Sequence, residues 1–542
     1  MLCLAMAISS GAQVFAQSAS TGIPQPVSKV WNPDAGDGTY KNPVLYADYS
    51  DPDVIRVGSD FYLVASSFDA VPGLPLLHSV DLVHWELIGH AFKQQPPLDV
   101  YRATQHGNGA WAPSIRYHAG DFFIFYPDPN YGIYMIKARS IRGPWSEPLL
   151  IKAAKGWIDP CPLWDDDGKA YLVNGLAASR AGVKTALVLS RMSPDGTKLL
   201  DDGALIIDGH EKDTTLEGPK LYKRHGYYYV FAPAGGVKPG WQLVYRSKSL
   251  YGPYERRVVL AQGSTDINGP HQGAWVDTLA GEDWFIHFRD IGAYGRVVSL
   301  EPMHWGSDEW PVIGVHPSAA GTGEPVASYT KPKVLQNTPV YTPPDSDEFN
   351  APALGVQWQW QANPQPSWAF PSSALGVLRL VNVPAPGADV NLWDVPSLLL
   401  QKFPAPAFTV TTKLTFTPRA PGDETGLVIM GRRYSALALQ NTAQGLVIKQ
   451  LIRQHADQAG PGTESTAIPV QGSTFYLRAV VDHQAMVNFF YSVDGTAFHP
   501  VGTPFQAVAG EWIGAKAGLF AIGAATQGEF GYADYDWFRF ET

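Results

Sequence analysis

The stretch SDPDVIRVGSDFY at residues 50–62 decides the fold, because four later stretches repeat its pattern. Each copy begins with a small or polar residue and a Pro or Gly, followed by an apolar run, a turn rich in Gly and Asp, and an aromatic residue. The later copies are APSIRYHAGDFF (112–123), DPCPLWDDDGKAY (159–171), GPKLYKRHGYYY (218–229) and QGAWVDTLAGEDW (272–284). Short apolar runs bounded by such turns predict β-hairpins. The chain therefore repeats one hairpin five times.

The spacing of the copies predicts a five-bladed β-propeller. The aromatic residues that open the second strand of each hairpin recur at intervals of 49 to 61 residues: Phe61, Phe122, Tyr171, Tyr227 and Trp284. Further strand-like runs follow each copy, such as LLHSVDLVHW and VYRSKSLYGPY. Four-stranded units at this period are typical of propeller blades. We expect the ring to cover residues 40–320.

Length and charge limit the class of protein. A chain of 542 residues is too long for one ordinary core, so we expect two domains. Lys and Arg number 40 against 50 Asp and Glu, a net charge of -10, which argues against a nucleic-acid partner. After the first residues no apolar run reaches the length of a membrane span. The 17 Trp and 25 Tyr residues suit either sheet cores or surfaces that stack on sugar rings.

The first residues resemble a secretory signal. MLCLAMAISSGAQVFAQ is apolar and ends in a small-residue pattern that predicts cleavage after Ala16, although it lacks the usual basic start. We therefore expect a signal peptide at 1–16, an N-terminal extension at 17–39 and a periplasmic or secreted protein. Beyond this leader Cys161 is the only cysteine, so the mature chain has no internal disulfide. We expect no catalytic role for Cys161.

A second domain follows the ring. Residues 321–344 are rich in Pro, Thr and Gly and predict a linker. Residues 345–542 alternate short strands and turns, as in FTVTTKLTF and TFYLRAVVD, without the acid-Pro repeat. This pattern predicts an antiparallel β-sandwich of the jelly-roll type, so the whole chain is all-β.

Three acids stand at the heads of the repeats. The first strand of each propeller blade lines the central channel, so the heads of the five copies should surround one mouth of it. Asp51, Asp159 and the Glu217-Gly218 pair bring three carboxylates there. An Asp before Pro can simply begin a turn, but three acids at one register favour an active site. Asp53 should lie further down the channel in a structural or water-binding role.

The chemistry of this arrangement suits glycoside hydrolysis. Like charges and burial separate the pKa values of neighbouring carboxyl groups, which assigns one as acid and another as base. Cleavage of a glycosidic bond needs a carboxylate to activate water and a carboxylic acid to protonate the leaving oxygen. We read the acids of the DDDG run, Asp165 to Asp167, as a solvated turn.

Four motifs resemble glycoside hydrolase family 43, and within it the exo-acting α-L-arabinofuranosidases and β-xylosidases. These motifs are YKNPVLYADYSDPDVIRVGSDFYLVASSF (40–68), IDPCPLWDDDGKAYLV (158–173), LEGPKLYKRHGYYYVFAPAGG (216–236) and GPHQGAWVD (269–277). The resemblance covers nearly the whole mature chain, and it implies a five-bladed ring, a concanavalin-like C-terminal domain and hydrolysis with inversion. It matches Asp51 to the general base, Glu217 to the general acid, and Asp159 to the third acid that orients Glu217 and modulates its pKa.

The resemblance also implies binding residues. Arg296 of AYGRVV matches an arginine that hydrogen-bonds the sugar, and Trp111 and Phe68 match the aromatic wall of the pocket. His271 of GPHQGAW matches a histidine that can hold a hydrated calcium at the channel centre. In the second domain, Asp347 and Asp536 are candidates for a structural calcium, with ordinary edge-strand acids as the alternative. No cofactor is required for the chemistry.

The expected function is an inverting exo-glycoside hydrolase that releases a terminal pentose from plant hemicellulose side chains or oligosaccharides. We expect α-L-arabinofuranosidase activity first and β-xylosidase activity as the alternative, with arabinoxylan, xyloglucan or arabinan as parent polymer. An inverting enzyme predicts about 6.5–9.5 Å between the Asp51 and Glu217 carboxyl groups. Two rivals remain: a non-catalytic carbohydrate-binding propeller, and a fructan-cleaving enzyme, although the latter usually carries Asn-Asp-Pro where this chain has Ser50-Asp51-Pro52.

Overall fold

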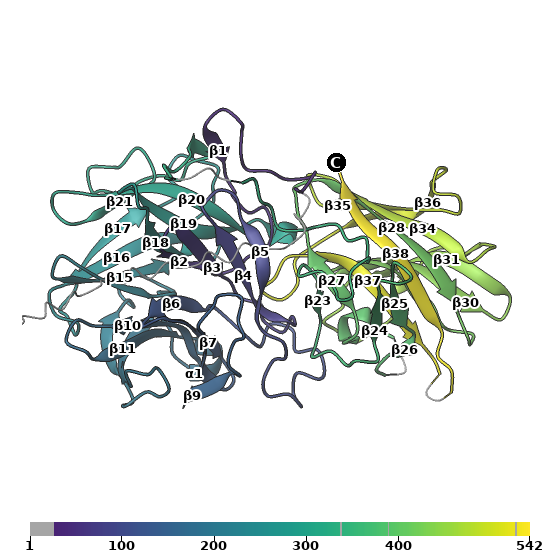
Figure 1. The fold of residues 1–542 in the computed structure, drawn as a ribbon, viewed down its shortest axis with the longest axis horizontal. Coiled ribbons are helices and arrows are strands. Elements are labelled where there is room, and N and C mark those ends of the chain that lie inside the picture. The colour runs from purple at the N-terminus through teal and green to yellow at the C-terminus, as the bar shows by residue number, and fades with distance from the viewer. Residues whose placement is uncertain (1–26, 336–338, 388–389, 526–527) are drawn as a thin grey trace, which may run out of the picture.

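The computed structural model describes residues 27–335, 339–387, 390–525 and 528–542. The predicted signal peptide at 1–16 and the first part of the predicted extension lie outside these residues. Two β-rich lobes lie side by side, with the purple-to-teal propeller beside the green-to-yellow sandwich (Figure 1). No helix among the described residues has the length and apolarity needed to cross a bilayer.

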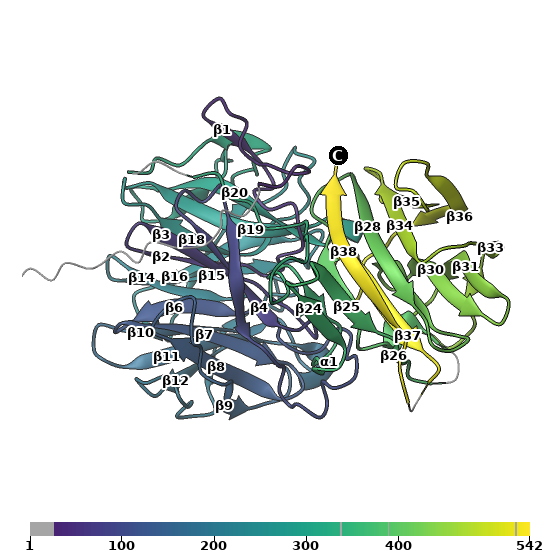
Figure 2. The same ribbon diagram turned by 45° about the vertical axis from the view of Figure 1, so that its right-hand side comes forward.

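The propeller prediction is confirmed. Within the described residues, five antiparallel sheets of four strands form the ring, and each sheet follows the order of the chain. The blades are β2–β5 (Asp53–Val57, Asp60–Val64, Gly73–Ser79, Glu86–Phe92), β6–β9 (Ser114–His118, Asp121–Asp128, Gly132–Ala138, Leu149–Ala153), β10–β13 (Trp157–Trp164, Ala170–Leu176, Ala186–Met192, Ala204–Asp208), β14–β17 (Lys220–Arg224, Tyr227–Ala234, Trp241–Ser247, Glu255–Leu260) and β18–β21 (His271–Asp277, Asp283–Asp290, Arg296–Trp305, Pro311–Ile313). Figure 2 shows the blades obliquely.

The core of the ring lies between neighbouring blades. Val54 and Leu63 of the first blade pack in one buried cluster with Ile286 and Leu300 of the fifth. Alternate residues of each strand face such a cluster because successive side chains of a strand point to opposite faces. The repeated apolar runs therefore cover one another pairwise around the ring and leave the first strand of each blade along the channel.

The start of the predicted ring, together with Thr39 at the end of the predicted extension, pairs with the predicted linker. β1 (Thr39–Lys41) and β22 (Ser328–Thr330) form a two-stranded antiparallel sheet, with Tyr40 opposite Tyr329. The Tyr40 hydroxyl also donates to the carbonyl of Leu300 at 2.7 Å. The two ends of the propeller segment are thus joined beside the first and fifth blades.

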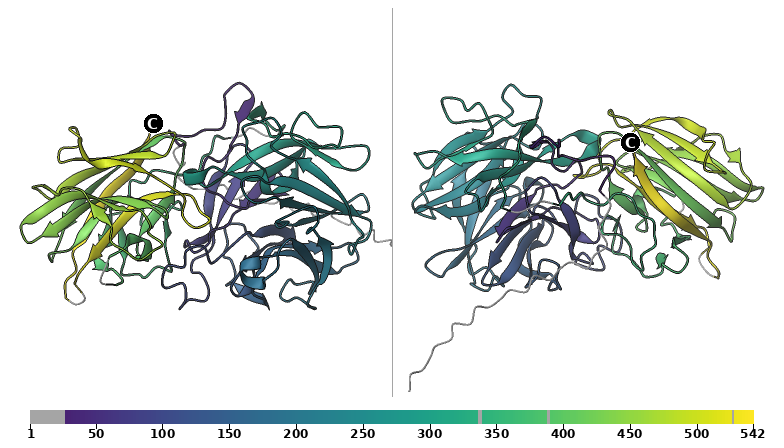
Figure 3. Two further views of the ribbon diagram at one scale, coloured as in Figure 1. Left: turned by 180° about the vertical axis from the view of Figure 1, so that it is seen from behind. Right: turned by 45° about the horizontal axis from the view of Figure 1, so that its top comes forward.

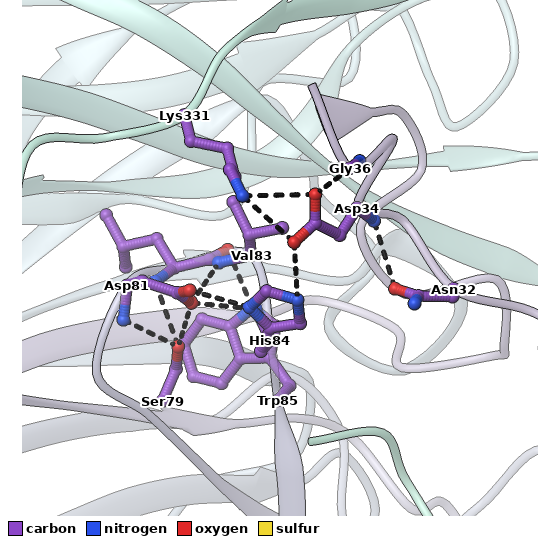
Figure 4. A network of polar contacts seen from close by, with 10 residues as sticks. Asn32, Asp34, Gly36, Ser79, Asp81, Val83, His84, Trp85 and Lys331 are labelled. Carbon is purple, nitrogen blue, oxygen red and sulfur yellow. Dashed lines mark hydrogen bonds and ion pairs between the residues drawn. The ribbon is translucent and has the colours of Figure 1, made fainter. Parts of the chain in front are cut away.

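A polar network holds the N-terminal segment against the first blade (Figure 4). The buried His84 imidazole lies between two carboxylates, with Nδ1 2.6 Å from Asp81 Oδ2 and Nε2 3.2 Å from Asp34 Oδ2. Lys331 Nζ lies 2.9 Å from the same Asp34 oxygen. One charged cluster therefore joins the N-terminal segment, the turn before Trp85 and the segment that leaves the ring.

The sandwich consists of two packed sheets of mostly antiparallel strands, as predicted. One sheet has the order β23-β27-β37-β29-β30-β31-β32, with β26 beside β37 and β33 beside β31, and the other has the order β24-β25-β38-β28-β34-β35-β36. The strand bounds are β23 Gln359–Trp360, β24 Ala369–Ser372, β25 Val377–Val381, β26 Val383–Pro384, β27 Leu399–Lys402, β28 Phe408–Thr417, β29 Glu424–Met430, β30 Tyr434–Thr442, β31 Gly445–Arg453, β32 Thr463–Glu464, β33 Ile468–Pro469, β34 Thr474–Val481, β35 Met486–Ser492, β36 His499–Gln506, β37 Lys516–Gly523 and β38 Tyr532–Glu541.

The two lobes are hydrogen-bonded to each other, and both views of Figure 3 show them in contact. Val71 and Trp360 exchange backbone hydrogen bonds of 3.0 and 2.6 Å. The Asn363 side chain accepts from the backbone of Gln95 at 2.7 Å, and the Tyr294 hydroxyl donates to the carbonyl of Pro406 at 2.7 Å. Loops that wall the channel mouth are therefore supported by the second domain.

Candidate active site

Four blades share one backbone turn at the head of the inner strand. Asp51, Asp159, Gly218 and Gln272 have φ angles of 55°, 56°, 60° and 36°. Residues other than glycine rarely adopt positive φ, and such conformations concentrate at functional sites. Gly218, rather than Glu217, is therefore the counterpart of Asp51 and Asp159. This corrects the expectation of three acids at one register, because Glu217 stands one residue earlier.

One cavity gathers the predicted site residues. It holds about 450 Å³ of space free of protein atoms. The six residues predicted for catalysis and sugar binding line it, together with the predicted calcium ligand: Asp51, Phe68, Trp111, Asp159, Glu217, His271 and Arg296. Their side chains come from all five blades or the loops between them, so closure of the ring brings them together.

Asp51 is held as an acceptor of several hydrogen bonds. The hydroxyls of Ser50 and Ser66 donate to its Oδ2 at 2.8 and 2.6 Å. Arg296 Nη1 lies 3.3 Å from Asp51 Oδ1 and also donates to Ser50 Oγ at 2.8 Å. These donors fix the orientation of the Asp51 carboxyl group, which a general base acting on a water molecule requires.

Asp159 is a buried acid that lies close to the other two carboxyl groups. It is 4% exposed, and burial together with the neighbouring carboxyl groups of Glu217 and Asp51 raises its pKa well above the ordinary value. The backbone N–H of Gly218 donates to Asp159 Oδ2 at 2.8 Å and opposes this effect. Asp159 therefore couples to the loop that carries Glu217 both through charge and through a hydrogen bond.

Glu217 contacts a histidine from the next blade. His271 Nε2 lies 3.0 Å from Glu217 Oε1, and the imidazole is 1% exposed. The Glu217 side chain is 24% exposed, so it reaches the open part of the cavity. Glu217 and His271 each stand one residue before the shared turn, which makes them equivalent positions of adjacent blades.

The second domain supplies one wall of the cavity that sequence reasoning missed. Trp512 lines it, with its ring centroid 6.1 Å from that of Trp111 and 5.6 Å from the Arg296 guanidinium carbon. The neighbouring Gly514 N–H and the Arg296 N–H both donate to Asp48, at 3.0 and 2.8 Å. Trp512 lies in a sandwich loop far from the repeats, so no motif of the ring indicated it.

The aromatic wall of the ring is built from two loops. Phe68 and Trp111 meet with ring centroids 6.2 Å apart, and Phe68 pairs with Ala110 through two backbone hydrogen bonds of 2.9 Å. Gly109 makes this approach possible, because a Cβ there would lie 2.1 Å from the Phe68 carbonyl oxygen. Arg180 covers Trp111, with its guanidinium carbon 5.2 Å from the ring centroid.

The remaining acids are engaged elsewhere. Asp53 is fully buried, accepts from Ile115 N and Arg116 Nη1 at 2.8 and 2.7 Å, and does not line the cavity. Its expected structural role agrees with these contacts. Asp165 differs from the solvated turn that we expected, because its side chain is 6% exposed, accepts from the Tyr228 hydroxyl at 2.6 Å and pairs with Lys223.

The cysteine is likewise structural. The Cys161 sulfur is buried, accepts from Arg116 Nη2 at 2.9 Å and does not line the cavity.

The three residues predicted as calcium ligands have the following contacts in the structure. His271 faces Glu217 through one nitrogen, and its Nδ1 is buried without a hydrogen-bond partner. Asp347 accepts from Phe349 N and Trp358 Nε1, whereas Asp536 pairs with Lys413 at 2.6 Å. Among the described residues no group of three or more His, Cys, Asp or Glu side chains is arranged to hold a metal ion. Both calcium sites therefore stay predictions.

Comparisons with known proteins agree with this geometry. Residues 40–311 match the family described as Glycosyl hydrolases family 43, and residues 346–541 match the Beta xylosidase C-terminal Concanavalin A-like domain. A putative beta-xylosidase of Xylanibacter ruminicola is 39% identical, covering 91% of this chain and 88% of the relative. A Bacteroides ovatus protein named non-reducing end alpha-L-arabinofuranosidase is 28% identical, covering 93% of this chain and 94% of the relative.

Solved structures extend the likeness to both domains. The crystal structure of the BlXynB protein of Bacillus licheniformis has a TM-score of 0.79 at 29% identity, covering 93% of this chain and 99% of that one. Both domains match the family, and the three acids lie in one cavity. The chain therefore belongs to glycosyl hydrolase family 43 and is a glycoside hydrolase.

Proposed function

We propose that this enzyme is an inverting, exo-acting β-xylosidase that removes a terminal xylose from xylan-derived oligosaccharides. The observation that carries the proposal is the position of Asp51 and Glu217 in one closed-sided cavity with aromatic and arginine contacts. Sequence analysis put α-L-arabinofuranosidase activity first. The relatives named beta-xylosidase, at 39% and 31% identity, support the reverse order.

The reaction follows from the roles of the acids. Asp51 removes a proton from a water molecule while that water attacks the anomeric carbon. Glu217 donates its proton to the glycosidic oxygen as the bond to the leaving sugar breaks. The proton lost by water ends on Asp51, and exchange with solvent restores both groups. Because water attacks opposite the leaving group, the configuration at the anomeric carbon inverts.

The surrounding residues position the sugar. Arg296 lies beside Asp51, where its remaining N–H groups can bind hydroxyls of the terminal ring. Phe68, Trp111 and Trp512 narrow the cavity and offer apolar surface to the ring. A cavity walled on its sides accepts a chain end rather than the middle of a polymer, which favours release of one sugar at a time.

α-L-Arabinofuranosidase activity is the second candidate, because the Bacteroides ovatus relative that bears this name aligns over 93% of the chain. Terminal xylopyranose and arabinofuranose present similar hydroxyls and differ mainly in ring shape.

The decisive experiment compares kcat/KM on 4-nitrophenyl β-D-xyloside and 4-nitrophenyl α-L-arabinofuranoside, with proton NMR of the first minutes of reaction. We expect the xyloside to be the better substrate and α-xylose to appear first. A better arabinofuranoside would select the second candidate, and β-xylose as the first product would exclude inversion. Binding without turnover of either substrate would favour the non-catalytic alternative.

A further inference from the structure

A second cavity lies where the propeller meets the sandwich. It spans about 690 Å³ of space free of protein atoms, a volume that includes open solvent at its mouth. It shares no lining residue with the cavity that holds the three acids. Its walls come from the N-terminal segment, the first blade, the segment at 341–345 and strand β27, so both domains contribute. Interfaces between domains are frequent places for small-molecule sites.

Aromatic side chains form much of its wall. Trp31, Tyr46, Tyr49, Trp85 and Tyr341 all line it. The Trp31 and Tyr46 rings lie 4.8 Å apart between centroids, and Tyr46 in turn meets Tyr294 at 5.7 Å. Fixed aromatic faces of this kind suit the apolar C–H face of a sugar ring.

Two polar side chains that line the cavity are donors without a hydrogen-bonding or ion-pairing acceptor among the described residues. Lys402 forms no ion pair with them, and its Nζ lies 5.3 Å from the centroid of the Tyr49 ring. Gln401 is 3% exposed, and its Nε2 is buried without a hydrogen-bond partner. A buried donor of this kind costs stability unless an acceptor meets it.

The nearby acids are already engaged. Asp345 lines the cavity but accepts from the hydroxyls of Ser28 and Ser346 at 2.6 and 2.8 Å. Burial lowers the pKa of Lys402 and Asp48 opposes that shift, yet the two Asp48 oxygens already accept the backbone N–H groups of Arg296 and Gly514. A carboxylate from outside the chain would give the Lys402 ammonium the acceptor that it lacks among the described residues.

We propose that this cavity is a second, non-catalytic site for a sugar acid of monosaccharide size. The carboxylate of the ligand pairs with Lys402, its hydroxyls or ring oxygen accept from Gln401, and its apolar face packs on the aromatic wall. A uronic acid meets all three requirements, whereas a neutral pentose lacks the charge and a simple carboxylate lacks the ring and the hydroxyls.

The walls of this site are fixed before any ligand arrives. Trp31 and Pro33 on one side and Val83 and Trp85 on the other line the cavity. The network of Asp34, His84 and Lys331 joins these two segments, as Figure 4 shows. A preformed site loses less conformational entropy on binding.

Isothermal titration of the full chain with D-glucuronate and D-xylose tests the proposal, because glucuronate is the xylose ring with one added carboxylate. We expect glucuronate to bind with a Kd of about 1 mM, the affinity typical of a ligand of this size. Lys402→Met should weaken glucuronate at least tenfold, and Gln401→Leu should weaken it as an independent variant. Lys413→Met, which removes a lysine on the other sheet, should leave it unchanged.

Three results would overturn the site. The first is that glucuronate does not bind at 20 mM. The second is that it binds Lys402→Met as tightly as the unsubstituted chain. The third is that it inhibits aryl xyloside hydrolysis competitively with a Ki equal to its Kd, which would place it at the three acids. Aryl xyloside hydrolysis by Lys402→Met reports that the variant is folded. Binding itself is measured by titration, so it is independent of the proposed β-xylosidase activity. If the enzyme prefers the aryl arabinofuranoside, that substrate replaces the xyloside in the inhibition and folding controls.

Discussion

His271 Nε2 lies 3.0 Å from Glu217 Oε1, and these two residues occupy equivalent positions at the heads of neighbouring blades. The imidazole contacts one oxygen of Glu217, and the other oxygen has no hydrogen-bond partner among the described residues. The contact therefore gives His271 a positioning role for the proposed general acid.

Replacing His271 tests that role. His271→Ala should lower kcat about 10- to 100-fold on xylobiose, because displacing a catalytic acid from its working position slows the chemical step by about that factor. KM should change little, since the ring-binding residues remain. On 4-nitrophenyl xyloside, whose leaving group needs little protonation, the loss should be much smaller. An equal loss on both substrates, or a loss confined to KM, would contradict a positioning role.

The assignment of acid and base predicts a contrast between two variants. Glu217→Ala should lower kcat on xylobiose about 10²- to 10⁴-fold, the usual contribution of a general acid, and should retain far more activity on aryl xylosides. Asp51→Ala should be inactive on both classes, because the water is not activated whatever group departs. Matched rates on the two substrates for Glu217→Ala would remove it from the acid role.

Asp159 predicts a stability that depends on pH. Its pKa is raised in the folded protein by burial and by the charges of Glu217 and Asp51, so the folded state holds the proton more tightly than the unfolded state. Below the ordinary Asp pKa of about 4 both states are protonated and no penalty exists. As the pH rises from there to the folded pKa, the folded state loses stability relative to the unfolded one.

Asp159→Asn should therefore raise Tm by roughly 2–4 °C at pH 8, equivalent to about 1 kcal/mol or slightly more, while it abolishes most activity. At pH 3.5 the two Tm values should nearly coincide. Scanning calorimetry across this range measures the difference, with exposed Asp99→Asn as the control that should show none. The same Tm difference at both pH values would show that the charge of Asp159 is not its cause.

Trp512 predicts a catalytic contribution from the second domain. Its ring is 44% exposed, lines the cavity of the three acids and lies near both Trp111 and Arg296. Trp512→Ala should lower kcat/KM on xylobiose about tenfold, which corresponds to about 1.4 kcal/mol of lost contact with the sugar. Trp537→Ala, on a sandwich strand that does not line the cavity, should have no such effect. Unchanged kinetics for Trp512→Ala would limit the sandwich to a structural role.

The ring and most of its active site could be predicted because they repeat. Asp51 and Asp159 head copies of one hairpin, so a pattern visible in the chain placed them at one channel mouth. The sequence pattern also indicated Glu217, but it did not show that Glu217 stands one residue before the position equivalent to Asp51 and Asp159. That offset depends on which residue takes the positive φ angle, and in this blade it is Gly218, where a Cβ would lie 2.9 Å from the Gln272 side chain.

The five blades, the β-sandwich and the residue types of the catalytic centre could be predicted from the sequence, because alternating apolar strands and Gly-rich turns act over a few neighbouring residues. Three contacts could not: Trp512 lines the active cavity, His271 contacts Glu217, and Lys402 and Gln401 line a second, aromatic cavity. These contacts join residues that are 54 to several hundred positions apart. Local pattern carries no information about such pairs, since closure of the ring and docking of the second domain set their distances.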